Sequence, residues 1–152
     1  MPLGLDDKRV HDKMIRASSY YNYYCRPASG RLNGRRAGRY GGAWCAKRSD
    51  RRQWLQVDFG AIAKVSRVAT QGRQNSAQWV KSYYLSYSRN GYRFITYKEN
   101  GRAKVSKEQW LIVLSDEKRA FPNSVVQPRN STLQGNVLLI LLGLDKPLTC
   151  PY

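Results

Sequence analysis

The sequence is poor in histidine and cysteine, and this scarcity excludes common kinds of metal site. It has one histidine, His11, and three cysteines, Cys25, Cys45 and Cys150, with no C-x-x-C pair. A structural zinc site needs four closely spaced Cys or His ligands, so we expect none here. The spacing permits a disulfide between Cys25 and Cys45 with Cys150 left over, and three reduced thiols are equally compatible with the sequence.

Long apolar runs are also missing. The run VLLILLGL at 137–144 is much shorter than the ~20 residues that a membrane-spanning helix requires. The first nineteen residues are polar and charged, without the apolar region of a secretory signal peptide. If this domain acts outside the cell, we expect the quoted chain to be a fragment or an incomplete reading frame.

The sequence contains no strong catalytic signature. It lacks G-x-S-x-G, H-E-x-x-H, P-loop and G-x-G-x-x-G motifs. The stretch SDEK at 115–118 matches S-x-x-K without its companion motifs, and His11 beside Asp12 has only hydrophilic neighbours. We therefore expect neither enzymatic activity nor a cofactor, and nothing in the sequence indicates calcium.

Positive charge is what the chain has in abundance. Lys and Arg number 27 against 10 Asp and Glu, a net charge of +17, and residues 13–98 hold eighteen basic residues but only two acidic ones. Such a field attracts polyanions such as nucleic acid, sulfated glycan or anionic lipid headgroups, whereas the plainer alternative is a solvated basic surface. One cluster offers planar donors for anions, and its members are Arg31, Arg35, Arg36, Arg39, Lys47, Arg48, Arg51 and Arg52.

Period-two patterns predict strands. QWLQVDFG (53–60) alternates apolar and polar residues and is closed by Gly60, and KVSRVATQG (64–72) is rich in β-branched residues. In YYLSYSRNGYRFITY (83–97), Asn90-Gly91 favours a type I′ turn and therefore a hairpin.

Two further apolar runs complete this pattern. WLIVL (110–114) indicates another strand, and the run at 137–144 fits either a strand or a short buried helix. No sustained helical period occurs, and residues 26–44 form a glycine- and arginine-rich loop region. We expect an antiparallel sandwich or barrel.

The stretch YYNYYCR at 20–26 admits three interpretations. As core it would bury several hydroxyls, each of which needs a partner. Beside arginines it would suit base stacking in a nucleic-acid-binding protein. As an exposed contact loop it would offer rings with one apolar and one wet end to a glycan, a protein or a membrane interface.

Seven blocks in register carry a resemblance to a known family. ASSYYN, RLNG, GAWCA, QWLQVDFG, VATQGR, WVKSYYLSYS and NGYRF resemble the discoidin domain, also called the coagulation factor 5/8 type C domain. The match is clearest over residues 3–98. We expect one domain over 1–152, with a divergent part at 99–152 for which a frameshift in the gene model is one hypothesis.

The resemblance implies an all-β fold, an eight-stranded distorted jelly-roll β-sandwich with projecting loops called spikes and, here, an atypical C-terminal part. It places the tyrosine run on the first spike, with Arg26 at its shoulder, the second spike within 34–42, and the third at 73–79. The contact residues so implied are Tyr20, Tyr21, Tyr23, Tyr24, Arg26, Arg35, Arg36, Arg39, Tyr40, Arg73, Gln74, Asn75 and Trp79.

The resemblance also implies a function. Family members are extracellular, non-enzymatic adhesion modules, which leads us to expect an anionic glycan, a cell-surface or matrix protein, or an anionic phospholipid as partner. The third spike, RQNSAQW, is mostly polar and therefore disfavours membrane insertion. Asn130 of NST would be a glycosylation acceptor if exported. A basic nucleic-acid-binding protein is the alternative class.

Two departures from the family pattern are visible. The family usually joins cysteines at its two ends, but this chain has none before PLGL, which leaves Cys150 without that partner. After Lys98 the closing pattern of the family is absent apart from FPNSVVQ at 121–127, which is faintly similar to it.

Overall fold

The regular structure of the chain is almost entirely β. The computed structural model describes residues 5, 8–35, 37–65, 67–73, 78–103, 105–107, 113–115 and 133–143. Within them the helices are single 3₁₀ turns, η1 (Asp12–Met14), η2 (Tyr23–Cys25) and η3 (Pro27–Ser29). The described strands are β1 (Ile15–Ala17), β2 (Trp54–Val65), β3 (Arg67–Ala69), β4 (Ser82–Ser88), β5 (Ile95–Thr96), β6 (Lys98–Glu99), β7 (Arg102–Ala103), β8 (Val105–Lys107), β9 (Val113–Ser115) and β10 (Leu133–Gly143). The all-β prediction is confirmed, whereas the expected count of eight strands is not.

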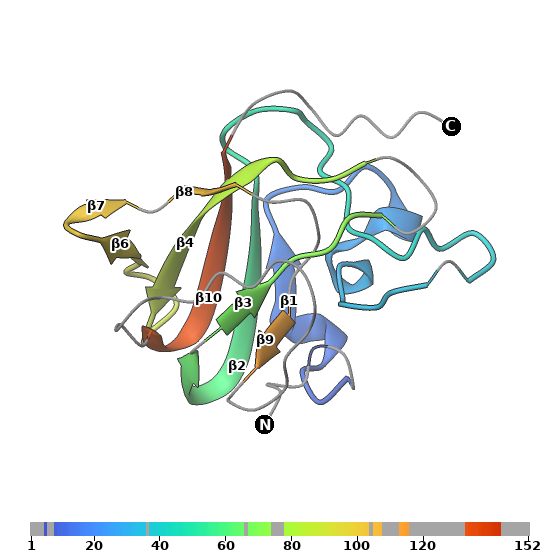
Figure 1. Cartoon of the computed structure of the whole chain (residues 1–152). Coiled ribbons are helices and arrows are strands. Elements are labelled where there is room, and N and C mark those ends of the chain that lie inside the picture. The colour runs from blue at the N-terminus through green and yellow to red at the C-terminus, as the bar shows by residue number, and fades with distance from the viewer. Residues whose placement is uncertain are drawn as a thin grey trace.

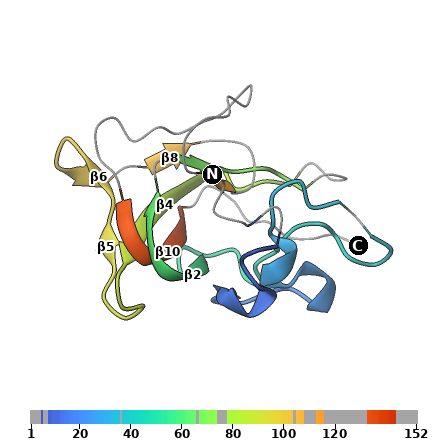
Figure 2. The same cartoon turned by 90° about the horizontal axis from the view of Figure 1, so that it is seen from below.

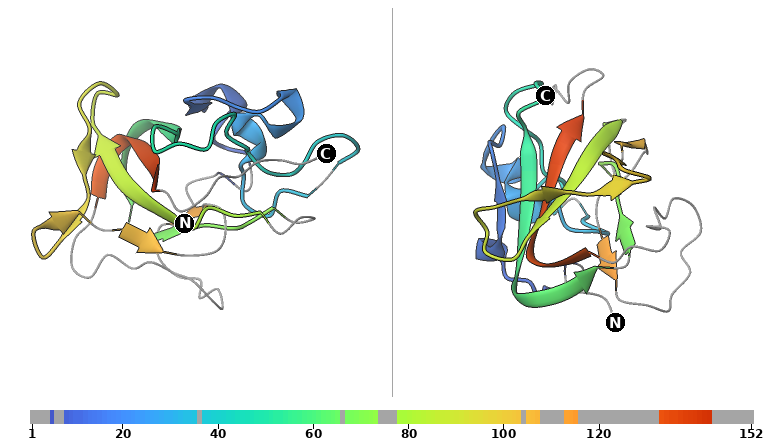
Figure 3. Two further views of the ribbon diagram at one scale, coloured as in Figure 1. Left: turned by 90° about the horizontal axis from the view of Figure 1, so that it is seen from above. Right: turned by 90° about the vertical axis from the view of Figure 1, so that its left-hand side faces the viewer.

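One antiparallel sheet organises the molecule. Its order is β1-β2-β10-β4-β5, and β8 also pairs with β4 (Figure 1). The strand β10, which comes last among the described strands, thus lies between β2 and β4. Figure 3 shows these three strands side by side.

The strands β3 and β9 pair with each other and form a separate two-stranded sheet. Val68 of β3 belongs to the same buried cluster as Leu55 and Val57 of β2 and Tyr83 and Leu85 of β4. The apolar positions of the main sheet alternate with more exposed ones, so one face of it is buried against this second layer.

The sequence pattern predicts that Gly60 ends its strand, and this prediction is wrong. The strand β2 continues to Val65, and its pairing with β10 shifts register between Gly135 and Val137. Gly60 has a φ of +71°, and a Cβ there would lie 2.9 Å from Met14 Cε. The glycine therefore permits an irregularity within the strand instead of a stop.

The hairpin predicted around Asn90-Gly91 is confirmed, but its turn is not type I′. Tyr87 pairs with Ile95, which leaves a longer connection than two residues. Only Gly91 has a positive φ in this turn, whereas a type I′ turn needs two such residues. The Asn90 side chain instead accepts hydrogen bonds from the backbone N–H groups of Tyr92 and Arg93, both at 3.0 Å.

The C-terminal apolar run is a strand, so the alternative of a short buried helix is wrong. As β10 it pairs with β2 on one side and β4 on the other. The expected strand at 110–114 is described only as β9, which begins at Val113. The frameshift hypothesis for 99–152 is not tested by these placements.

Arg31 is a structural residue, which corrects its assignment to an anion-binding cluster. Its side chain is buried and donates to the carbonyls of Leu5 at 2.9 Å and Val10 at 2.7 Å. Arg31 also forms an ion pair with one carboxylate oxygen of Asp12 at 2.7 Å, and the other oxygen of Asp12 forms an ion pair with Arg26 at 3.2 Å. Arg31 thereby attaches the N-terminal segment to the loop region, and its burial keeps the guanidinium away from a ligand at the surface.

Replacing Arg31 with methionine is expected to lower the free energy of unfolding by about 3 kcal/mol, because it leaves the carbonyls of Leu5 and Val10 without their buried donor. Urea denaturation followed by tryptophan fluorescence measures this change. The matched control is Arg48→Met, at an exposed arginine between the loop region and β2. Equal stability of the two variants would contradict the structural role of Arg31.

Candidate functional site

Three loops that carry the predicted contact residues meet at one side of the molecule. They are the first spike (20–26), the second spike (34–42) and the third spike (73–79), of which 36 and 74–77 lie outside the described residues. The blue-to-cyan loops at the right of Figure 1 include the first two spikes, on the opposite side from β6 and β7. A Cβ on Gly41 would lie 3.5 Å from both Cys25 Sγ and an Arg73 guanidinium nitrogen. Parts of all three spikes therefore meet around Gly41.

The base of the first spike is fixed by a buried glutamine. Gln53 Oε1 accepts hydrogen bonds from the hydroxyls of Ser18 and Ser19. Ser18 Oγ accepts the backbone N–H of Trp54 at 3.0 Å, and the indole of Trp44 donates to the carbonyl of Ser19 at 2.9 Å. Three of the sequence blocks that carry the family resemblance, ASSYYN, GAWCA and QWLQVDFG, thus meet at this point.

Asp50 completes this network. It accepts a hydrogen bond from the Gln53 amide at 2.8 Å and one from the backbone N–H of Arg52 at 2.9 Å. The Gln53 hydrogen bond, followed by that of Arg52, lowers the pKa of Asp50 below its usual value. The carboxylate is therefore charged at neutral pH and orients Gln53 for its bonds to the two serines.

Asn22, the single non-tyrosine in YYNYY, starts the short helix η2. Its side-chain oxygen accepts the N–H groups of Tyr24 at 3.0 Å and Cys25 at 3.2 Å. This is the capping role that asparagine fills well, because its short side chain reaches the first free N–H groups of a helical turn. The turn separates Tyr20 and Tyr21 from Tyr23 and Tyr24.

Backbone hydrogen bonds join the first spike to residues 41–45. Tyr21 N–H donates to the Cys45 carbonyl at 2.8 Å, and Cys45 N–H donates to the Cys25 carbonyl at 3.2 Å. Gly41 N–H donates to the Tyr24 carbonyl at 3.2 Å. The end of the second spike is therefore held directly beside the first.

The second spike is a narrow loop with a tight turn near its end. Its two ends, Gly34 and Gly42, approach so closely that a Cβ on either would lie 2.7 Å from the other's carbonyl oxygen. Ala37 and Tyr40 exchange backbone hydrogen bonds of 3.2 and 3.0 Å, with Gly38 at a φ of +57° between them. This turn places Arg39 at its tip and directs the chain back at Tyr40.

Three rings from the two spikes form what we call the tyrosine cluster, Tyr23, Tyr24 and Tyr40. The ring centroids are 6.2 Å apart for Tyr23 and Tyr24, 6.1 Å for Tyr23 and Tyr40, and 5.6 Å for Tyr24 and Tyr40. These edge-to-face and tilted contacts are the geometry that aromatic pairs prefer. Tyr23 is 55% exposed and Tyr40 is 39% exposed, so the cluster presents a preformed aromatic surface to solvent.

Two arginines border the cluster. The Arg26 guanidinium lies 4.9 Å from the centre of the Tyr23 ring and donates to the Tyr23 hydroxyl at 3.1 Å. Arg39 donates to the Tyr24 hydroxyl at 3.4 Å and is exposed. Each guanidinium has further N–H donors beyond those bonds, so the border can still bind an anion.

Two further pairs of predicted contact residues lie on the first and third spikes. Tyr20 and Tyr21 are exposed on the first spike, outside the three-ring cluster. Within the third spike, the Arg73 guanidinium donates a hydrogen bond to the Gln78 side-chain oxygen at 2.9 Å, and Trp79 is half-buried.

Arg35 has an exposed guanidinium without a hydrogen bond or ion pair in the described part of the chain. It lines a small pocket of about 210 Å³ with Asn33, Gly34 and Gln71. The predicted residues Arg36, Gln74, Asn75 and Asn130 lie outside the described residues.

Cys25 and Cys45 are both buried, and the disulfide that their spacing permits stays a prediction. The hydrogen bond between their backbones makes them close neighbours. Cys150 lies outside the described residues.

The described part of the chain holds no cluster of three or more His, Cys, Asp or Glu side chains that could bind a metal ion. In the same residues, no helix has the length and apolar character needed to cross a membrane.

Comparison with known proteins identifies the family. The model of the F5/8 type C domain matches residues 14–125. Coagulation factor V of Mus musculus is 42% identical over 104 residues, which cover 64% of this chain and 5% of that protein. The chain therefore corresponds to a small part of this relative's length.

Solved structures show the same fold. Discoidin II from Dictyostelium discoideum superposes with a TM-score of 0.65 at 20% identity, covering 84% of this chain and 48% of that one. The family 32 CBM of NanJ from C. perfringens, solved in complex with galactose, has a TM-score of 0.57 at 18% identity over 88% of this chain and 85% of that one.

Domains of this kind are binding modules and generally non-catalytic. The sequence match over 14–125, the β-sandwich neighbours and the three spikes that meet at one side lead to one conclusion. The chain belongs to the F5/8 type C domain family.

Proposed function

We propose that this domain is an extracellular adhesion module that binds an anionic glycan through the tyrosine cluster and the arginines beside it. The observation that carries the proposal is the contact among Tyr23, Tyr24 and Tyr40 from two spikes, with Arg26 and Arg39 against their hydroxyls. No catalytic role is proposed.

The chemistry of the cluster suits a sulfated or carboxylated sugar chain. Exposed aromatic rings can contact the C–H faces of sugar rings, and tyrosine hydroxyls can exchange hydrogen bonds with sugar hydroxyls. Arginine guanidinium groups make charge-assisted, often bidentate bonds to sulfate or carboxylate. The net charge of +17 adds long-range attraction for a polyanion.

Preorganisation supports the same surface. The rings contact one another, and the backbone bonds between the spikes hold Tyr24 and Tyr40 in place. Ordering a flexible aromatic loop on binding would reduce affinity, and here little of that ordering remains to be done.

Two other partners fit less well. Insertion into a membrane calls for large apolar side chains at the spike tips, whereas the cluster carries hydroxyls and the third spike is RQNSAQW. The nucleic-acid alternative has charge and aromatic rings in its favour, but no described feature resembles a nucleic-acid-binding motif.

The direct test is binding to a heparin oligosaccharide by isothermal titration calorimetry. Replacing Tyr23 and Tyr40 together with alanine is expected to weaken binding by about thirtyfold, because two rings of the contact surface are lost. Unchanged heparin affinity would contradict the proposal.

The matched control is Ile62→Ala, which removes an exposed apolar side chain on β2, outside the spikes. Its heparin affinity is expected to match that of the unmodified domain. Phosphatidylserine vesicles and single-stranded DNA serve as competing probes. If either probe binds more tightly than heparin, the proposed glycan is wrong and the ligand is a lipid or a nucleic acid.

Charge is tested separately by Arg35→Ala combined with Arg39→Ala. Removing two exposed guanidinium groups is expected to weaken heparin binding about tenfold in low salt and to flatten its dependence on NaCl, since screened charge pairs contribute less as salt rises. The control is Arg51→Ala with Arg52→Ala, an exposed pair of the same charge outside the spikes. If both pairs weaken binding equally, general attraction and not the spike surface determines the affinity.

A further inference from the structure

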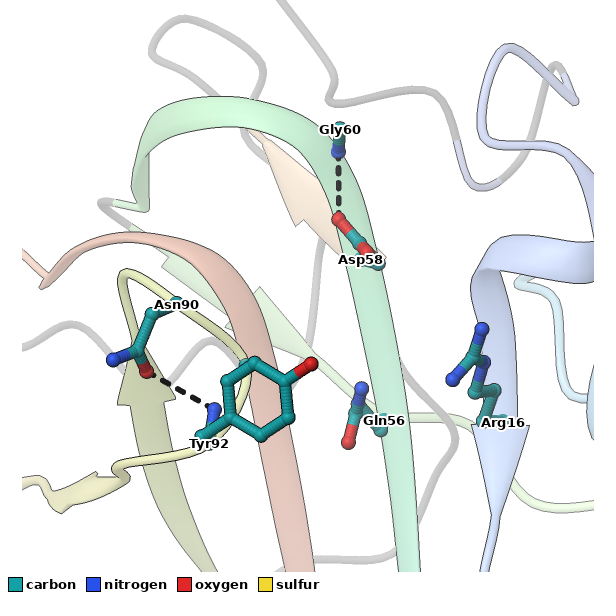
Figure 4. A pocket seen from close by; sticks show the side chains of 7 residues that line it. Arg16, Gln56, Asp58, Gly60, Asn90 and Tyr92 are labelled. Atoms are coloured by element: carbon teal, nitrogen blue, oxygen red, sulfur yellow. Dashed lines mark hydrogen bonds between the residues drawn. The ribbon is translucent and has the colours of Figure 1, made fainter.

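A pocket on the main sheet lies apart from the spikes. It has a volume of about 320 Å³ and is lined by Arg16, Gln56, Asp58, Gly60, Asn90, Gly91 and Tyr92 (Figure 4). Its lining comes from β1, from β2 and from the turn between β4 and β5. Figure 2 shows β5, which follows that turn, on the opposite side of the molecule from the blue-to-cyan loops. We call it the sheet pocket.

The floor of the sheet pocket is a row of polar side chains. Arg16 and Gln56 are direct partners in the antiparallel pairing of β1 and β2, so their side chains stand on the same face. Asp58 follows on that face two residues later. This is the face of the sheet opposite to the buried Leu55 and Val57.

These floor side chains are available to a ligand. Arg16 and Gln56 make no side-chain hydrogen bond or ion pair within the described residues. One oxygen of Asp58 accepts the Gly60 backbone N–H at 2.8 Å, and its second oxygen has no such partner there. A guanidinium, a carboxamide and a carboxylate oxygen therefore offer donors and acceptors side by side.

The wall of the sheet pocket is an aromatic ring on a fixed turn. Tyr92 is 90% exposed. Its backbone N–H donates to Asn90 at 3.0 Å, and Ser88 Oγ accepts the Gly91 N–H at 2.9 Å, so side chains hold the turn that carries it. In Figure 4 the Tyr92 ring lies across the ribbon of β10, with Gln56 beyond it and Arg16 on the far side of Gln56.

We propose that the sheet pocket is a second carbohydrate site, which binds one uncharged hexopyranose unit. A hexopyranose has hydroxyls that both donate and accept, which match the guanidinium, carboxamide and carboxylate of the floor, and a C–H face that can lie on the Tyr92 ring. The size is in the range of small-molecule pockets.

The charges of the pocket select against other ligands. Asp58 in the floor repels phosphate, sulfate and carboxylate, and among the described lining residues Arg16 is the single cationic side chain. A lipid chain would leave three polar groups of the floor without partners. The site therefore differs in ligand charge from the tyrosine cluster, and it does not depend on that proposal.

The test uses saturation-transfer NMR with the methyl glycosides of glucose, galactose and mannose. We expect at least one of them to bind with a dissociation constant in the millimolar range, as is usual for a small ligand in an open site. Tyr92→Ala and Gln56→Ala are each expected to weaken that binding about tenfold, through loss of the ring contact or of a hydrogen-bonding pair.

Ile95→Ala is the matched control, because Ile95 is 58% exposed on the adjacent strand β5 but does not line the pocket. It is expected to bind the glycoside like the unmodified domain. The inference is overturned if none of the three glycosides shows saturation transfer at about 10 mM, a concentration that detects millimolar affinity. It is also overturned if Tyr92→Ala and Gln56→Ala bind as the control does.

Heparin affinity, measured on the same variants, separates this site from the spikes. Tyr92→Ala is expected to keep the heparin affinity of the unmodified domain while losing glycoside binding. Equal loss of both ligands would assign them to one site and contradict a separate sheet pocket.

Discussion

The candidate binding surface depends on the backbone hydrogen bonds between the first spike and residues 41–45. The described residues of the first and second spikes contain no strand and no helix longer than one 3₁₀ turn, and a single turn such as η2 is not stable in isolation. The bonds from Tyr21 to Cys45, from Cys45 to Cys25 and from Gly41 to Tyr24 join the two spikes. Because of them, rings sixteen residues apart in sequence contact each other.

Much of the fold was predictable from the sequence, because a half-buried strand has alternating apolar and polar residues that can be recognised in the sequence. The alternation in 53–60 corresponds to β2, and the aromatic runs on either side of Asn90-Gly91 correspond to β4 and β5. The roles of Gly60 and Asn90 were not predictable in the same way. A glycine is compatible with a strand end or with an irregularity, and an asparagine side chain can replace a backbone turn.

The candidate site was predictable in its position but not in its geometry. Resemblance to the family placed the tyrosines and Arg39 on spikes, yet only the structure separates Tyr23 and Tyr24 from Tyr20 and Tyr21 and joins them to Tyr40. Asn22, which interrupts the tyrosine run, is a typical capping residue and was the one sequence signal that separates Tyr20 and Tyr21 from Tyr23 and Tyr24. The sheet pocket gave no signal, since its lining comes from three segments that β-pairing brings together.

The central claim is that the tyrosine cluster contacts the ligand, and ligand-induced chemical-shift changes test it most directly. In a domain labelled with ¹³C at the tyrosine rings, a heparin oligosaccharide is expected to shift the ring signals of Tyr23, Tyr24 and Tyr40 more than that of Tyr92. The account is contradicted if the signals of the cluster stay in place at saturating oligosaccharide while those of other tyrosines move.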